Sequence, residues 1–183
     1  MTSWVALLRA INVGGRNRVP MAELRDLAVG LGFGRVRTWL QSGNLVFSDD
    51  GKSPGEIEAT LGRAIEERLS LKVDVVVRSA SELAGVIRSN PFATAAESDP
   101  SHLLVMFLKA TPLQEKLEAL RDSIRGPELI EAQGHHLYLV YPAGIGTSKL
   151  TNAVIESKLG VRGTARNWNT VLKLADLGGA ATD

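Results

Sequence analysis

Residues 4–21, WVALLRAINVGGRNRVPM, constrain the fold more than any other stretch because they combine a buried strand, a turn and a helix start. Residues 4–11 form a short apolar run followed by Gly14-Gly15, which is typical of a central strand. Pro20 suits the first position of a helix, and apolar residues recur at helical spacing after Met21. The same strand–loop–helix order returns from residue 103 onward in different residues. This stretch therefore predicts both a fold and an internal repeat.

The rest of the first half completes a β-α-β-β-α-β order. Strands are predicted at 36–41 and 44–48, joined by the two-residue turn Ser42-Gly43. A helix over 57–69 and a strand over 73–78 follow, and we expect that strand to have one solvent-facing side. An extra helix at 81–89 ends at Asn90-Pro91. This order is that of the ferredoxin-like (α/β-plait) unit.

The second half repeats this order. We predict a strand at 103–108, a helix from Pro112, a hairpin of 128–132 with 136–141, a helix capped by Ser148, a strand at 163–167 and a helix from Trp168. The predicted fold class is therefore α+β. It is a tandem duplication of ferredoxin-like units with antiparallel sheets, each followed by an extra helix. The predicted boundaries are 1–90 for the first unit, 91–101 for a polar linker and 102–183 for the second unit.

Composition limits the class of protein. The chain has 183 residues, of which 44% are hydrophobic and 22% charged, and its net charge of +1 gives no strong field to recruit nucleic acid or membrane. It contains no cysteine, which excludes disulfides and thiolate metal sites and is compatible with a reducing compartment. No leader pattern and no apolar run near the roughly 20 residues of a membrane helix are present. We expect a cytoplasmic protein with no membrane partner.

The first hairpin predicts one polar sheet face, because successive strand residues point to opposite sides. Val36, Leu40, Leu45 and Phe47 are expected to meet the helices. The opposite face gathers polar and aromatic side chains: Arg37, Trp39, Gln41 and Asn44, with Arg9, Asp74 and Arg78 by parity. This face either packs against the second unit or forms a ligand groove. A groove that stacks nucleic-acid bases, as RNA-recognition domains do, is a weaker form of the ligand-groove hypothesis, because Trp39 is the one aromatic residue on this face.

Two other stretches suit an anion. Residues 144–149, GIGTSK, combine flexible glycines with Lys149 before a predicted helix, although they match neither a phosphate loop nor a dinucleotide fingerprint. Ordinary capping by Ser148 is the alternative reading. Residues 166–170, RNWNT, offer a guanidinium with amide side chains, and Asn167 or Asn169 can cap the last helix. A solvated basic surface is the alternative for Arg166.

The Gly14-Gly15 loop and residues 166–170 are both basic and free of acids, so we predict that they lie on one side of a shared site. If no bound anion neutralises these basic charges, Asp74 and Glu131 are the acids expected to do so. The three histidines, His102, His135 and His136, do not predict a metal site, because adjacent strand residues point apart.

The chain resembles the bacterial family called domain of unknown function 1697. The resemblance depends on motifs spread over nearly the whole chain: residues 7–15 (LLRAINVGG), 21–24 (MAEL), 41–44 (QSGN), 90–92 (NPF), 148–150 (SKL) and 166–170 (RNWNT). Ala10 stands where the family usually has glycine. The resemblance implies two α/β-plait halves and implies no activity.

From the sequence we expect a binding protein for an anionic ligand, a nucleotide or a nucleic acid, held between or on the two units. The predicted ligand contacts are Arg9, Asn12, Gly14, Gly15, Gln41, Asn44, Lys149, Arg166, Asn167 and Asn169. An enzyme acting on a small phosphorylated or carboxylated metabolite, or a purely structural or partner-binding module, is the alternative. The sequence identifies no catalytic residue and no cofactor.

Overall fold

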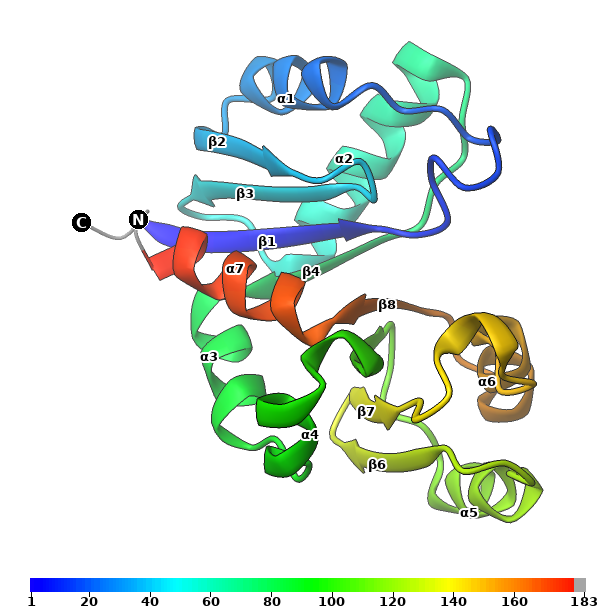
Figure 1. The fold of residues 1–183 in the computed structure, drawn as a ribbon. Helices are drawn as coiled ribbons and strands as arrows, with labels where there is room; N and C mark the ends of the chain where they lie inside the picture. Colours follow the sequence, from blue (N-terminus) through cyan, green and yellow to red (C-terminus); the bar gives the residue numbers. More distant parts are fainter. Residues whose placement is uncertain (180–183) are drawn as a thin grey trace. The chain divides into compact units, whose positions relative to one another are not determined.

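The computed structural model describes residues 1–179, which form two compact units (Figure 1). Within the described residues, unit 1 comprises Met1–Ile87 together with residues 173–179, and unit 2 comprises Arg88–Leu172. The last helix therefore begins in unit 2 and ends in unit 1. No helix within residues 1–179 combines the length and the apolar character needed to cross a membrane.

Unit 1 follows the predicted β-α-β-β-α-β order. Its elements are β1 (Thr2–Leu8), α1 (Met21–Gly30), β2 (Gly34–Trp39), β3 (Asn44–Asp49), α2 (Pro54–Leu69), β4 (Val75–Ser79) and α3 (Ala80–Arg88). The four strands form an antiparallel sheet in the order β2-β3-β1-β4.

Helices α1 and α2 cover one face of this sheet (Figure 1). Alternate residues of β1, namely Trp4, Ala6 and Leu8, point into this core because strand side chains alternate between faces. Helix α2 begins with a capping box, in which the Ser53 hydroxyl accepts from the Glu56 amide and the Glu56 carboxylate accepts from the Ser53 amide. The core face predicted from residue alternation is confirmed for Leu45 and Phe47.

The second face of this sheet is also buried. Val5, Leu7, Val46 and Val76 point to it and have no exposed surface. The end of α7 lies on it, because Lys173 Nζ is 5.6 Å from the centre of the Trp39 ring and Gly178 lies against Ser3 and Ala80. The expectation that β4 has a solvent-facing side is therefore wrong.

The hairpin between β2 and β3 differs from the predicted two-residue turn. Trp39 pairs with Asn44, so the connection has four residues, 40–43. Leu40 adopts a positive φ of 57° and points outward instead of joining the core. Gly43 packs so closely on Leu8 and Ile11 that an added Cβ would lie 2.5 Å from Ile11 Cδ1. The close packing at Gly43, with its own φ of 82°, requires glycine there.

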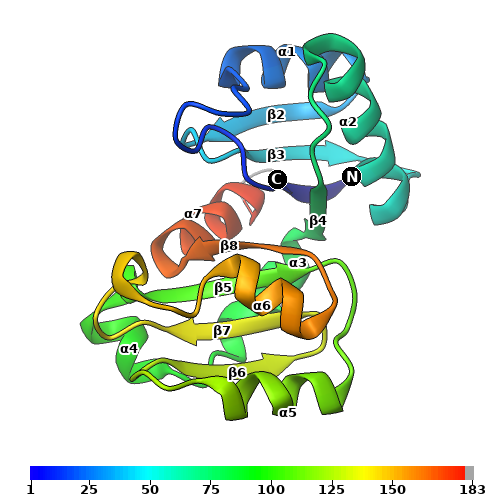
Figure 2. The same ribbon diagram turned by 90° about the vertical axis from the view of Figure 1, so that its right-hand side faces the viewer.

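Unit 2 repeats the order after two short helical segments. It contains α4 (Ala93–Ser98), η1 (Pro100–His102), β5 (Leu103–Leu108), α5 (Gln114–Ser123), β6 (Leu129–Gln133), β7 (His136–Val140), η2 (Ile145–Thr147), α6 (Asn152–Leu159), β8 (Gly163–Asn167) and the start of α7 (Trp168–Gly179). The antiparallel sheet has the order β6-β7-β5-β8, and α5 and α6 cover one of its faces (Figure 2). Residues 91–101, predicted as a linker, hold α4 and most of η1.

The two units agree at the level of single hydrogen bonds. Leu8 and Arg9 donate their amides to Gly43 and Asp74, and Leu108 and Lys109 donate theirs to His135 and Arg162 at the corresponding places. Buried arginines also correspond: Arg78 pairs with Val5 of β1, and Arg166 pairs with Val105 of β5. Each donates from Nη1 to the carbonyl of the preceding residue at 2.8 Å. The structure therefore consists of two similar sheet–helix units.

Candidate functional site

The loop after β1 is held rigid by the side chain of Asn12. Its Nδ2 donates to the carbonyls of Val19 at 3.0 Å and Gln41 at 2.6 Å, and its Oδ1 accepts from the Val19 amide at 2.9 Å. Asn17 adds a bond from its Nδ2 to the Ala10 carbonyl at 3.1 Å. Asn12, predicted as a ligand contact, thus uses its amide to join this loop to the β2–β3 turn.

Five residues of this loop have positive φ: Ala10, Asn12, Gly14, Gly15 and Asn17. Such conformations are uncommon for residues other than glycine, and among those residues asparagine is one that adopts them most readily. No atom lies within 4 Å of a Cβ placed on Gly14 or Gly15, so both glycines serve the backbone conformation rather than a close approach. The structure gathers Arg9, Asn12, Gly14, Gly15 and Gln41 at this end of the unit 1 sheet.

Asn44 has a structural role in the same region. It is fully buried, and its Nδ2 donates to the Trp39 carbonyl at 2.7 Å and to the Ser42 hydroxyl at 3.0 Å. Trp39 is half-buried beside Lys173. The polar character of this sheet face therefore stabilises the hairpin, and Gln41 keeps its exposed side chain.

Arg166 is buried rather than solvated. Its Nη1 donates to the Thr164 hydroxyl and the Ala165 carbonyl, both at 2.8 Å, and burial lowers its pKa to about 10. Asn167 is the cap of α7, since its Oδ1 accepts from the Thr170 amide at 2.9 Å, whereas Asn169 is exposed. Arg9 belongs to unit 1 and Arg166 to unit 2, and their shared site stays a prediction.

The two acids expected near such a site have different neighbours. The Asp74 carbonyl accepts the Arg9 amide, and Glu131 forms an ion pair with Arg121 at 2.8 Å. Glu131 is therefore already balanced within unit 2.

Lys149 lies at a cavity of about 380 Å³ in unit 2. The cavity is bordered by the segment after α5, the segment between β7 and α6, and one side of α6. Three cationic side chains line it: Arg125, Lys149 and Lys158. Within residues 1–179 none of the three forms an ion pair, although Arg125 Nη1 donates to the Asp122 carbonyl at 2.9 Å.

A hydrogen-bonded pair connects the two loops of this cavity. The Ser148 hydroxyl donates to Glu128 Oε1 and accepts from the Leu150 amide at 3.0 Å. The prediction that Ser148 caps α6 is therefore wrong. Thr151 does so through a bond from the Val154 amide at 3.2 Å. Glu128 can approach because residue 126 is glycine, whose absent Cβ would overlap the carboxylate.

A hydrogen bond also fixes the apolar wall of the cavity. Ile124, Leu150 and Val154 contribute to it, and the Tyr141 hydroxyl donates to the Leu150 carbonyl at 2.9 Å. Burial, with a smaller effect of Glu128, raises the pKa of Tyr141 to about 12. Lys149 and its neighbours thus surround a preformed cavity that is cationic at its rim and apolar inside.

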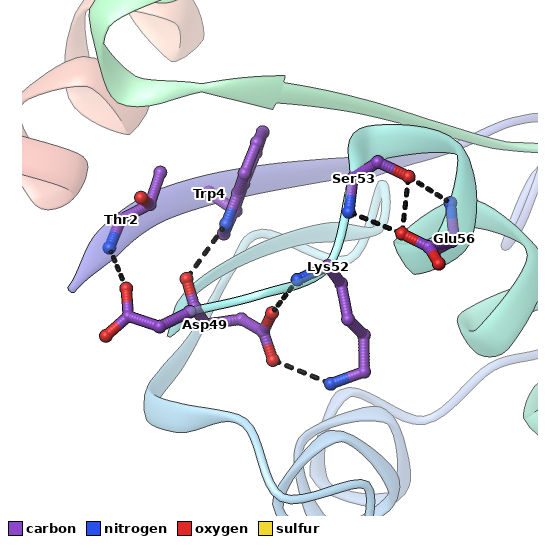
Figure 3. Close-up of polar contacts among 7 residues, drawn as sticks. Thr2, Trp4, Asp49, Lys52, Ser53 and Glu56 are labelled. Carbon is purple, nitrogen blue, oxygen red and sulfur yellow. Dashed lines mark hydrogen bonds and ion pairs between the residues drawn. The ribbon is translucent and has the colours of Figure 1, made fainter.

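The matching loop of unit 1 is neutralised. Lys52 Nζ lies 2.8 Å from Asp49 Oδ1 and 5.3 Å from the centre of the Phe33 ring, and the Lys52 amide donates to Asp49 Oδ2 (Figure 3). The two loops have similar sequences, yet only the lysine of unit 1 has a carboxylate partner within the described residues. Lys149 is therefore available to an external anion in a way that Lys52 is not.

Comparisons with known proteins place the chain in a family. Residues 1–138 match the model of the family described as "Protein of unknown function (DUF1697)". The chain belongs to the DUF1697 family. A solved structure, a conserved bacterial protein from Streptococcus pneumoniae, shares its fold with a TM-score of 0.76 at 21% identity, covering 96% of this chain and 98% of that one. No curated protein matches the chain.

The cavity of this DUF1697 chain includes residues that sequence reasoning missed. Lys158 lies one turn beyond Val154 on the same side of α6, and that spacing could have revealed it once Lys149 was suspected. No sequence pattern around Arg125 indicated a ligand contact, because Arg125 reaches the cavity through the tertiary packing of α5 against α6. Within residues 1–179 no group of three histidine, cysteine, aspartate or glutamate side chains is arranged to hold a metal ion.

Proposed function

We propose that the unit 2 cavity binds a small anionic molecule, of the phosphorylated or carboxylated class. The observation that carries this proposal is the convergence of Arg125, Lys149 and Lys158 on one cavity without ion-pair partners among residues 1–179. Like charges kept close together in a cavity repel each other unless a bound anion or solvent compensates them.

The dimensions and lining favour a small molecule over a nucleic acid strand. A cavity of about 380 Å³ lies at the lower end of the range for ligand sites, about 300–1,000 Å³. Guanidinium and ammonium groups would hold the anionic group, and Ile124, Leu150 and Val154 would receive an apolar part. A mononucleotide or a phosphorylated metabolite fits this description better than an extended chain.

An enzyme remains the alternative, and Glu128 is the residue that favours it. It is the one carboxylate among the residues lining the cavity, and its partner Ser148 fixes its orientation. A carboxylate held beside a cationic seat could move a proton at a bound substrate. Turnover lost in Glu128→Gln, with binding retained, would be the result that distinguishes this alternative.

The test uses inorganic phosphate as the probe and two lysine variants. Each charge-assisted contact contributes about 1.5–3 kcal/mol where it is well formed, so Lys149→Ala should weaken phosphate binding by about tenfold or more. Lys52→Ala is the control, because this lysine of the corresponding loop in unit 1 is already paired with Asp49. Amide chemical shifts in a phosphate titration measure both.

The proposal fails if Lys149→Ala binds phosphate as well as the unaltered chain does, or if Lys52→Ala weakens binding equally. Native mass spectrometry of the purified protein would then identify any molecule that the cavity retains.

We also propose that each unit is a ferredoxin-like plait and that the chain arose by duplication. The support is the β-α-β-β-α-β order, the strand orders β2-β3-β1-β4 and β6-β7-β5-β8, and the corresponding hydrogen bonds of the two units. A crystal structure in which the two sheets with their helices fail to superpose would refute this. A cytoplasmic location, supported by the absence of cysteine, is tested by cell fractionation.

A further inference from the structure

A second cavity in unit 2, of about 430 Å³, shares no lining residue with the cationic one. Most of its wall is apolar and comes from the segment before and within α4, from the start of β6 and from the end of β7. The apolar contributors include Pro91, Phe92, Ala95, Leu129, Val140 and Pro142. One side carries His102 and Asp99. The cavity therefore combines an apolar interior with a single imidazole.

Hydrogen bonds fix the segment that forms the apolar wall. Asn90 Oδ1 accepts from the Phe92 amide at 3.0 Å, which forms a local turn that sets the direction of Phe92. The Phe92 carbonyl accepts from the Ala96 amide at 3.0 Å. Gln133 Nε2 donates to the Ser89 carbonyl at 3.0 Å and ties this segment to β6. The wall is thus preformed, as ligand sites usually are.

The imidazole is oriented by a carboxylate. His102 Nδ1 lies 2.6 Å from Asp99 Oδ2, and the Ser101 hydroxyl donates to Asp99 Oδ1 at 2.9 Å. The Ser101 hydrogen bond, and then His102, lower the pKa of Asp99, so its carboxylate is ionised at neutral pH. An ionised carboxylate at this distance requires the proton of a neutral imidazole to sit on Nδ1. His102 Nε2 then presents a lone pair as a hydrogen-bond acceptor.

The backbone fixes His102, whose side chain is 40% exposed. The His102 carbonyl accepts from the Tyr141 amide at 2.9 Å, which fixes the residue against the end of β7. A Cβ on Gly144, whose φ is 82°, would lie 3.5 Å from Nε2. Glycine at this position therefore leaves uncovered one side of the nitrogen that a larger residue would contact.

We propose that this cavity binds a small apolar molecule that carries a hydroxyl group, with the hydroxyl donating to His102 Nε2. The apolar wall receives the body of the ligand, and the imidazole acceptor lies on the polar side of the cavity, which Thr94, Ser98 and Asp99 also line. Asp99 also lines the cavity, and the role assigned to it is to position His102 by fixing its tautomer. This site is separate from the cavity lined by Arg125, Lys149 and Lys158, and the proposal does not depend on anion binding there.

The experiment compares phenol with benzene, which has the same ring and no hydroxyl. Phenol should bind about fivefold more tightly, the factor expected for one net hydrogen bond, and should shift the His102 Nε2 resonance in histidine labelled with nitrogen-15. His102→Phe should remove the preference for phenol over benzene. His135→Phe, at the β6–β7 turn outside the cavity lining, is the matched control and should keep the preference.

A second variant separates a positioning effect from damage to the cavity. In Asp99→Asn the amide can donate to Nδ1, which moves the imidazole proton to Nε2 and removes the acceptor. The preference for phenol should fall in this variant while benzene binding persists. Equal affinity for both probes, a preference that survives His102→Phe, or no binding of either probe at millimolar concentration would each overturn the proposal.

Discussion

Asn12 offers the most direct test of the loop after β1. Its side chain makes three hydrogen bonds, with the Val19 amide, the Val19 carbonyl and the Gln41 carbonyl. At about 1 kcal/mol each, their loss in Asn12→Ala should lower the free energy of unfolding by about 2–3 kcal/mol. Asn12 also has a φ of 53°, and alanine in this conformation costs about 1 kcal/mol more. We therefore expect a total loss of about 3–4 kcal/mol.

Two further variants separate the loss of hydrogen bonds from the conformational cost in this change in the free energy of unfolding. Asn12→Gly removes the same hydrogen bonds without the conformational cost, so it should be the milder substitution by about 1 kcal/mol. Asn17→Ala has a similar conformational cost at φ 49° but loses one side-chain bond, to the Ala10 carbonyl. Its loss should be about 1–2 kcal/mol.

Urea unfolding followed by circular dichroism measures all three variants, with unchanged denaturant slopes as the sign that only stability has changed. A free energy of unfolding for Asn12→Ala within about 0.5 kcal/mol of the unaltered chain would refute the reasoning, because it would place Asn12 outside the cooperatively folded structure. A loss for Asn17→Ala as large as that for Asn12→Ala would equally contradict the role of the bonds to Val19 and Gln41.

Two further predictions concern stability. Burial raises the pKa of both tyrosines, Tyr138 and Tyr141, to about 12, above the unfolded value of about 10, so the stability they contribute is present below pH 10 and lost as the pH rises toward 12. Alkaline titration of tyrosinate absorbance should show no ionisation near pH 10 while the protein stays folded, and a normal titration there would contradict their burial. Ser53→Ala removes the capping box of α2 and should lower the free energy of unfolding by about 1 kcal/mol in a thermal melt, whereas Ser157→Ala, an exposed serine within α6, should be nearly neutral.

The order of the strands and helices was predictable because apolar spacing in this chain follows the structural periods closely. The boundaries of β8 and the start of α7 at Trp168 agree with the prediction, since Asn167 is both the last strand residue and the cap of the helix. The β2–β3 turn was not predictable from Ser42-Gly43 alone. Its register is set by the bond from the buried side-chain Nδ2 of Asn44 to the Trp39 carbonyl, and a sequence pattern does not report that contact.

The candidate site was predictable only in part for a similar reason. Lys149 could be found because glycine, serine and lysine occur together before a helix. Ser148 was assigned to the wrong partner, because its hydroxyl is used by Glu128, which is twenty residues earlier in the chain. Arg166 was expected at the surface or on a ligand, yet its place opposite Val105 buries it. In each case, contacts between residues distant in sequence determine which polar group remains available.

The position of helix α7 affects how the chain folds during translation and how a truncated fragment should behave. The segment from Lys173 to Gly179 belongs to unit 1, although the rest of that unit ends at Ile87. During translation the first unit can form its strands early, but one face of its sheet stays incomplete until the ribosome has made the last helix. A fragment ending near residue 90 should therefore expose the apolar side chains of Val5, Leu7 and Val76 and tend to aggregate. The sequence repeat and the unit that can fold independently are different segments of this chain.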